Sequence, residues 1–293
     1  MPPLVPLPAI LLSLALAALV AGGGYRARAL SGSGAAAAMV VGALVFGLGG
    51  AVWGLLLVFF FVSSSALSLW RAEDKREAEG RSSKDSRRDW GQVLANGGLG
   101  AVLALLQAVG RAGWLPWLAE VDLLPAFAGL MAAVTADTWA TELGLLSPTP
   151  PRLITTGEEV APGTSGGVTA LGLTAAAAGG LVIGLVAVLG SIVSQLVALR
   201  SLDLALVDTM ALARLAFISP LVGLASAAAD SLLGATAQAM FKDPRGGQTE
   251  RASGVRGQHV LLRGRRWMTN DRVNFLAGLL GALLALGLDR LLV

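Results

Sequence analysis

Long apolar stretches recur along the whole chain and limit it to one kind of fold. A helix needs about 20 apolar residues to cross a hydrocarbon core of about 30 Å. In lipid each backbone polar group must also be paired, which a helix achieves within its own segment. The sequence therefore predicts an all-α fold, a polytopic transmembrane bundle of seven or eight spans that forms a single integral membrane domain over residues 1–293. The stretches are 4–24, 34–50, 51–69, 92–110, 123–147, 166–190, 206–240 and 273–293.

The composition agrees with a membrane protein and excludes several types of catalytic or metal site. Hydrophobic residues make up 55% of the chain and charged residues 14%, far from the values of soluble domains. The chain has no cysteine and one histidine, His259, so thiol nucleophiles, disulfides and histidine clusters are excluded. The net charge of +3 reflects the membrane topology described next, and we expect no nucleic-acid partner.

Lysine and arginine predict the orientation of the bundle. The segments 70–90 and 241–272 hold 15 of the 22 basic residues, so both should be cytoplasmic. We expect residues 148–165 on the same side, in a bacterial inner (plasma) membrane whose lipids surround the bundle. The stretch 203–240 is too long for one ordinary span, yet two crossings would move the following basic segment outside. We therefore expect one crossing, an interfacial or re-entrant piece near residues 201–203 and a helix break at Pro220.

Polar groups inside apolar helices are costly and usually mark a cavity or a site. The strongest such pattern is Asp137-Thr138 followed by Thr141-Glu142, which places two carboxylates and two hydroxyls on the last turns of one span. Hard oxygen ligands of this kind suit Mg²⁺ held between carboxylates and substrate phosphates. The alternative is that Glu142 is a solvated residue at a helix end.

Three further polar elements lie near the same membrane face. Asp230-Ser231 repeats the pattern of an aspartate followed by a hydroxyl, and two such helices facing each other would give a two-aspartate metal site. Asn270 and Asn274 lie one turn apart where the last span begins, and Asp271 is either part of the site or a charge that complements the helix dipole. Asn96 is an amide within an apolar span and needs a partner.

A glycine-rich segment precedes the span at 166–190. Its free N–H groups and hydroxyls, together with the positive end of the helix dipole, predict a phosphate cradle at Gly163, Thr164, Ser165, Gly166 and Gly167. The alternative is a flexible turn in which Thr164 or Ser165 is the N-cap. No Walker-type lysine follows, so the segment is not a P-loop. The segment 241–272 either contacts anionic lipid headgroups or folds over a phosphate ligand.

Several motifs together resemble one family of integral membrane proteins, the phytyl-phosphate kinase family. The resemblance covers about residues 30–290 in order. It implies transfer of a phosphoryl group from a nucleoside triphosphate to a prenyl (phytyl or geranylgeranyl) monophosphate, giving the diphosphate in isoprenoid salvage. A looser similarity to the CTP-dependent phytol and dolichol kinases points to CTP as the donor. The motifs are Ser63–Ser65, Arg88–Trp90, Leu94–Gly98, Ala136–Gly144, Thr155–Gly157, Gly163–Val168, Asp230–Ala235 and Asn270–Asn274.

Phosphoryl transfer needs positioning and charge neutralisation more than covalent help, and the residues supply both. We expect Asp137, Glu142 and Asp230 to bind Mg²⁺, the glycine-rich segment to cradle a phosphate, and Lys84, Arg87 or Arg88 to neutralise charge. The catalytic set we expect is Asp137, Glu142, Asp230, Asn96, Asp271 and Asn274.

Other functions fit the sequence less well. In an ion-coupled transporter Asp137, Glu142 and Asp230 would couple ions at mid-depth in the membrane, whereas the polar residues here lie near one face. The D-G-x-x-A-R signature of CDP-alcohol phosphotransferases is absent, and lipid phosphatases need more than one histidine. The oligomeric state leaves no trace in the sequence.

Overall fold

A computed structural model of the protein describes residues 7–71, 73–75, 87–200, 208–242, 248–250, 252–254 and 257–293. Within these ranges the fold is all-α with a few short strands, as predicted, and seven helices are long and apolar enough to cross a membrane. Helix α6 is an eighth long helix of lower hydropathy. The long helices are α1 (Leu7–Arg26), α2 (Gly32–Leu44) continued by the π-helix η1 (Val45–Gly49), α3 (Ala51–Leu69), α5 (Trp90–Arg111), α6 (Leu124–Gly144), α7 (Ala170–Leu199), α8 (Thr209–Thr236) and α9 (Asn270–Leu291).

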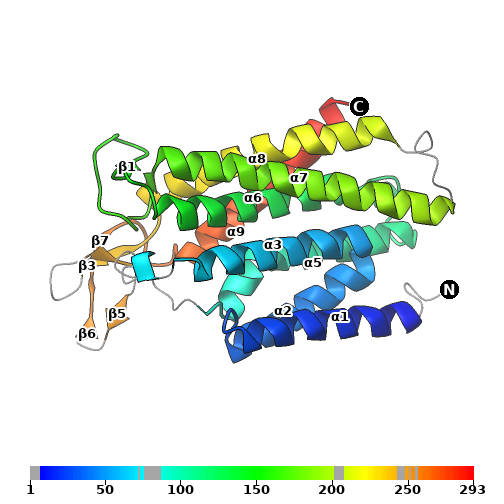
Figure 1. The fold of residues 1–293 in the computed structure, drawn as a ribbon, viewed down its shortest axis with the longest axis horizontal. Helices are drawn as coiled ribbons and strands as arrows, with labels where there is room; N and C mark the ends of the chain where they lie inside the picture. Colours follow the sequence, from blue (N-terminus) through cyan, green and yellow to red (C-terminus); the bar gives the residue numbers. More distant parts are fainter. Residues whose placement is uncertain are drawn as a thin grey trace.

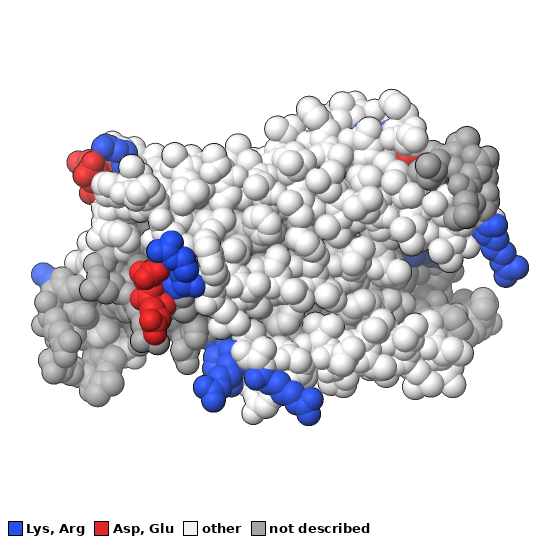
Figure 2. Space-filling model, in the orientation of Figure 1, with Lys and Arg blue, Asp and Glu red and all other residues white. Residues whose placement is uncertain are grey.

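The long helices lie roughly side by side and alternate in direction (Figure 1). The segment between α6 and α7 and the strands between α8 and α9 meet at one end of the bundle, at the left of the figure, which we call the cap end. Charged side chains on the face in Figure 2 gather toward the two ends, with a broad uncharged surface between them. This arrangement suits a bundle that crosses a bilayer.

The stretch 203–240 contains one long helix, and the predicted break at Pro220 is wrong. Helix α8 runs from Thr209 to Thr236 with Pro220 inside it. A proline is tolerated in a membrane helix where neighbouring helices and hydroxyl side chains compensate for the lost hydrogen bond. Gly180 of α7 packs directly on the backbone at Ser219 and Pro220, so a neighbouring helix supports α8 at the proline. Ser219 Oγ also donates to the Leu215 carbonyl at 2.8 Å, one residue before the Ala216 carbonyl that Pro220 leaves without its helical partner. The interfacial or re-entrant piece expected near residues 201–203 lies outside the described residues.

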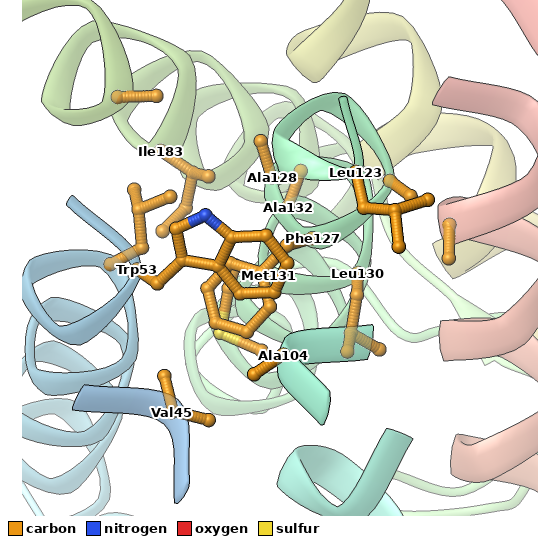
Figure 3. Packing of buried hydrophobic residues seen from close by; sticks show 14 of the residues in the cluster. Val45, Trp53, Ala104, Leu123, Phe127, Ala128, Leu130, Met131, Ala132 and Ile183 are labelled. Carbon is orange, nitrogen blue, oxygen red and sulfur yellow. The ribbon is translucent and has the colours of Figure 1, made fainter. Parts of the chain in front are cut away.

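Helix α6 lies at the centre of the bundle, and this position explains why it is less hydrophobic than the other long helices. It packs against α3, α5, α7, α8 and α9. Its buried residues run without a break from Pro125 to Ala136, so protein and not lipid surrounds it. The Trp53 ring of α3 stacks on the Phe127 ring of α6 with centroids 4.3 Å apart, in the cluster drawn in Figure 3. A helix enclosed in this way can carry polar residues that a lipid-facing helix cannot.

Short strands cover the cap end, and the sequence had not indicated them. Between α6 and α7, β1 (Arg152–Leu153) pairs antiparallel with β2 (Gly167–Val168). Between α8 and α9, a three-stranded sheet has the order β4 (Gln248–Thr249), β3 (Met240–Lys242), β7 (Val260–Arg263), beside the pair β5 (Ser253–Gly254) and β6 (Gly257–Gln258). The basic segment 241–272 is therefore folded against the bundle in its described part. The short 3-10 helix η2 (Pro116–Leu118) lies between α5 and α6.

Candidate active site at the cap end

A cavity of about 640 Å³ opens at the cap end and gathers residues from six helices, five of which contribute polar side chains. Helices α3, α5, α6, α7, α8 and α9 contribute to its wall, and residues of the 151–169 segment complete it. We call it the main cavity. The predicted site residues that line it are Arg88, Asn96, Asp137, Glu142, Gly163, Thr164, Ser165, Gly166, Gly167, Asp230 and Asn274.

Asp137 of α6 and Asp230 of α8 lie against each other in this wall, with their carboxyl groups within hydrogen-bonding reach. Asn274 of α9 joins them, because its side-chain amide donates to Asp230 Oδ2 at 3.0 Å and to the Asn270 carbonyl at 3.2 Å. Two ionised carboxylates in contact repel each other, and a cation or a shared proton removes that repulsion. The pair is therefore a natural place for a cation.

Small residues bring the two aspartates together. A side chain on Gly179 of α7 would lie 3.3 Å from the Ala136 backbone, and one on Gly223 of α8 would lie 3.2 Å from the Ala136 methyl group. Glycine at both positions lets the α7 and α8 backbones approach α6 just before Asp137. The same helix packing that stabilises the bundle therefore sets the distance between the aspartates.

Glu142 lies on the same wall but is held by a different set of partners. Lys75 Nζ donates to Glu142 Oε2 at 2.6 Å and to the Leu67 carbonyl at 2.7 Å, and its side chain is fully buried. Ser68 of α3 donates to the other Glu142 oxygen at 2.5 Å. The sequence analysis missed Lys75 as a site residue, because it was counted only among the cations that set orientation. The one feature of the sequence that could have indicated Lys75 is its position, six residues after the end of α3 and so close to the cap end of the bundle.

Arg88 occupies the wall between α3 and α5. Its guanidinium donates to Ser65 Oγ at 2.7 Å and lies 5.9 Å from the centre of the Phe61 ring. Burial lowers the pKa of Arg88, and the nearby Glu142 carboxylate raises it again, so the residue stays a cation. Arg88 is therefore a fixed positive charge facing an otherwise acidic cavity.

The glycine-rich segment forms a tight loop over α8, and helix α7 begins later than predicted. Thr169 is the N-cap of α7 and accepts from the Gly172 N–H at 2.9 Å, so neither Thr164 nor Ser165 caps it. Gly163 and Gly166 have positive φ angles of 78° and 84°, which glycine adopts without strain. The N–H groups of Thr164 and Gly167 are used in turns, at 3.1 and 2.9 Å.

Hydrogen bonds made by two side chains, Arg263 and Gln238, connect this loop to the strands at the cap end. Arg263 of β7 donates to the Ser165 carbonyl and to the Ala235 carbonyl, each at 2.7 Å. The buried Gln238 accepts from Ser165 Oγ at 2.9 Å and donates to Glu250 Oε1 at 2.7 Å. Burial lowers the pKa of Arg263. The cap strands therefore hold the loop beside Asp230.

Two predicted residues lie apart from this wall, and a third is outside the described residues. Asp271 is in the first turn of α9, where an acidic residue complements the helix dipole, and is not among the residues that line the main cavity. Arg87 likewise does not line it. Lys84 lies outside the described residues.

The described residues contain no group of three or more histidine, cysteine, aspartate or glutamate side chains able to hold a metal ion. Glu142 is thus not gathered with the aspartate pair. Mg²⁺, however, keeps several waters and commonly binds proteins through one or two carboxylates together with substrate phosphates. The Asp137–Asp230 pair, set in a cavity large enough for a phosphate ligand, fits that donor set.

Comparison with known proteins finds a matching family and related sequences. The family described as "Integral membrane protein DUF92" matches residues 15–282. The chain is 34% identical over 236 residues to Protein PGR of Arabidopsis thaliana. The aligned region covers 78% of this chain and 79% of that protein. It is 32% identical over 160 residues to an uncharacterized membrane protein of Methanocaldococcus jannaschii, covering 55% and 62% of the two chains. No solved structure matches the chain.

Proposed function

Because the chain belongs to the DUF92 family of integral membrane proteins, we propose that it is a membrane kinase acting on a prenyl monophosphate. The donor is a nucleoside triphosphate, CTP by the resemblance described above. The acceptor is phytyl or geranylgeranyl monophosphate. An oxygen of the prenyl phosphate forms a new bond to the γ-phosphorus while the bond from that phosphorus to the β-phosphate oxygen breaks. The products are the prenyl diphosphate and the nucleoside diphosphate.

The observation that carries the proposal is the composition of the main cavity. One cavity wall combines the Asp137–Asp230 pair, the cation Arg88 and a glycine-rich loop. Phosphoryl transfer requires charge neutralisation and alignment of two phosphates, and these groups supply both requirements. A transporter would place its ion-binding carboxylates near mid-depth, whereas this cavity lies at the cap end of the bundle.

Each group has a role in the proposed reaction. Asp137 and Asp230 would hold Mg²⁺, with Asn274 orienting Asp230 through its 3.0 Å hydrogen bond. When bound, Mg²⁺ neutralises phosphate charge and aligns the phosphate oxygens. Arg88 would bind the acceptor phosphate, because a guanidinium matches phosphate oxygens with two parallel N–H groups. The acceptor is already an anion, so the reaction needs no strong general base.

The loop Gly163–Gly167 would bind the donor phosphates. Its five residues line the main cavity, and hydrogen bonds from Arg263 and with Gln238 hold it in place. The positive-inside rule places the basic segments 70–90 and 241–272, and therefore the cap end, on the cytoplasmic side, where nucleotides are available. We propose that the membrane is a bacterial inner (plasma) membrane.

The direct test offers detergent-purified protein geranylgeranyl or phytyl monophosphate with Mg²⁺ and each of CTP, UTP, GTP and ATP in turn. Mass spectrometry then detects the prenyl diphosphate. The proposal predicts metal-dependent product with one preferred nucleotide. Absence of product with every pair, from protein that keeps its unfolding transition, would contradict it.

A further inference from the structure

A second, apolar cavity of about 60 Å³ adjoins the main cavity. It lies between α1, α2 with η1, α3 and α5, and we call it the apolar cavity. Its wall is made of alanine, valine, leucine, phenylalanine and glycine, apart from three polar residues. Those three, Arg88, Gln92 and Asn96, also line the main cavity. The two cavities therefore meet along one row of polar side chains.

Backbone hydrogen bonds and an aromatic contact hold Arg88 at this junction. Its backbone N–H donates to the Ala29 carbonyl and its own carbonyl accepts from the Ser31 N–H, each at 3.0 Å. Its guanidinium lies over the Phe61 ring, which belongs to the wall of the apolar cavity. In the described part of the chain, one of its five N–H donors is used by a side chain, that of Ser65. Within the described ranges no other residue accepts a hydrogen bond from its guanidinium, which leaves donors for an anion.

We propose that the apolar cavity receives the first part of the prenyl chain, with the phosphate head of the same molecule bound to Arg88 in the main cavity. The proposal deepens the proposed function and rests on it for the identity of the ligand. An amphiphile with an anionic head and an apolar tail is the chemistry that a cationic junction between a polar and an apolar cavity recognises. Asn96, at the same junction, would contact the head.

The size of the apolar cavity sets how much of the tail it holds. At about 60 Å³ it has room for roughly four water-sized spheres, so it takes only the carbons nearest the phosphate. Phe46, Leu57, Val58 and Phe61 of its wall are partly exposed. The rest of the chain therefore leaves the protein along these side chains and lies in the bilayer.

Gly97 of α5 provides a sharp test of the tail site. A methyl group added there would lie 3.1 Å from Val41 Cγ1 and 3.9 Å from Leu57 Cδ1, two residues of the apolar wall. The neighbouring Gly98 is a matched control, because its added methyl group would meet only Leu94 at 3.6 Å, an ordinary contact. Both substitutions change glycine to alanine in the same helix, so their effects on helix propensity are equal.

The experiment measures binding of geranylgeranyl monophosphate to purified protein in the absence of nucleotide. Gly97→Ala should weaken binding by about tenfold or more, the effect of one methylene in an apolar pocket, while Gly98→Ala binds as the unaltered protein does. Octadecyl monophosphate is the straight-chain comparison. Equal affinities for all three proteins would overturn the tail site. Octadecyl monophosphate that binds as tightly as the prenyl compound and responds equally to Gly97→Ala would overturn its assignment to a prenyl chain.

A second measurement keeps the proposal testable if Gly97→Ala does not fold. A geranylgeranyl monophosphate carrying a photoreactive diazirine on its first isoprene unit is cross-linked to the unaltered protein, and labelled peptides are identified by mass spectrometry. Labels should fall on α2, α3 and α5, and labels confined to α7 and α8 would overturn the proposal. Correct labelling without any phosphoryl transfer would leave the tail site intact and refute the kinase function alone.

Discussion

Asp137 and Asp230 lie in contact within the wall of one cavity although they belong to separate helices, and neither carboxylate is paired with a lysine or arginine in any described salt bridge. Asn274 reaches the pair from a third helix. Stability alone does not favour two buried carboxylates side by side, because both lose hydration and they repel each other. Such an arrangement suits a site that binds a cation.

Replacing one aspartate should not weaken the fold in the absence of metal. Asp137→Asn or Asp230→Asn removes a like charge while keeping the shape, so the unfolding midpoint in chelator should stay the same or rise. Thermal unfolding in detergent measures this. Asp122→Asn at the opposite end, where Asp122 accepts from the Leu124 N–H at 3.0 Å, is the control and should be neutral. A fall of several degrees for the cavity variants alone would make the pair structural.

Mg²⁺ should stabilise the unaltered protein through the same pair. A ligand that binds only the folded state raises stability by about 2.7 kcal/mol at a hundred times its dissociation constant. We expect the unfolding midpoint to rise with Mg²⁺ concentration, and the rise to disappear in Asp137→Asn. The Asp122→Asn control should respond as the unaltered protein does. An identical Mg²⁺ response in Asp137→Asn would remove the pair as the metal site.

The Lys75–Glu142 ion pair should be important for stability. Lys75 is fully buried, so Glu142→Gln leaves its ammonium without a counter-charge, a loss of about 3–5 kcal/mol for a buried pair. Lys75→Met combined with Glu142→Gln should recover a large part of that loss. A double-mutant cycle on unfolding free energies measures the coupling. Additive losses in the cycle would mean that the two side chains do not act as a pair.

Gly166 should tolerate no side chain. Its φ is +84°, and an added methyl group would lie 2.5 Å from the Ala235 methyl group of α8. Gly157 has a similar φ of +73° but open space around it, so Gly157→Ala carries only the backbone strain of about 1 kcal/mol. We expect Gly166→Ala to be clearly less stable than Gly157→Ala and to raise the nucleotide KM. Equal behaviour of the two variants would show that the loop does not depend on its contact with α8.

Arg263 should position the loop without touching the reacting atoms. Arg263→Lys keeps the charge but cannot bridge two carbonyl oxygens in the same way. We expect a raised nucleotide KM with a smaller change in kcat and an unchanged KM for the prenyl phosphate. The exposed Arg265, changed to lysine, is the matched control. An effect of Arg263→Lys on kcat alone would contradict a positioning role.

Much of the fold could be predicted because the length of an apolar stretch, which decides whether a helix can cross a membrane, is a local property of the sequence. Helix α6 was found from sequence although its hydropathy is lower than that of the seven other long helices, because its polar residues come at one end. The strands of the cap were missed, since each has only two to four residues and is stabilised by partners distant in sequence. The break at Pro220 was wrong because the packing of Gly180 outweighs local helix propensity.

The site was predictable where a pattern repeated and unpredictable where tertiary contacts decide. The aspartate-hydroxyl repeat predicted two facing helices, and Asp137 and Asp230 do face each other, although their chemical role stays a prediction. Lys75 was missed because its burial depends on Glu142, 67 positions away. Asp271 and Arg87 are neighbours in sequence of residues that line the cavity, but neither lines it itself. Asp271 lies in the first turn of α9, and Arg87 lies in the bend before α5.

The most direct test of the account compares the rate of prenyl diphosphate formation by the unaltered protein, Asp137→Asn, Asp230→Asn and Asp122→Asn, with the preferred nucleotide and saturating Mg²⁺. Loss of an essential charge-stabilising group typically lowers kcat by about 10²-fold or more. The account predicts that loss for both cavity variants, with an unchanged rate for Asp122→Asn. Retention of more than about a tenth of the rate in either cavity variant, a loss far smaller than such groups cause, would contradict it.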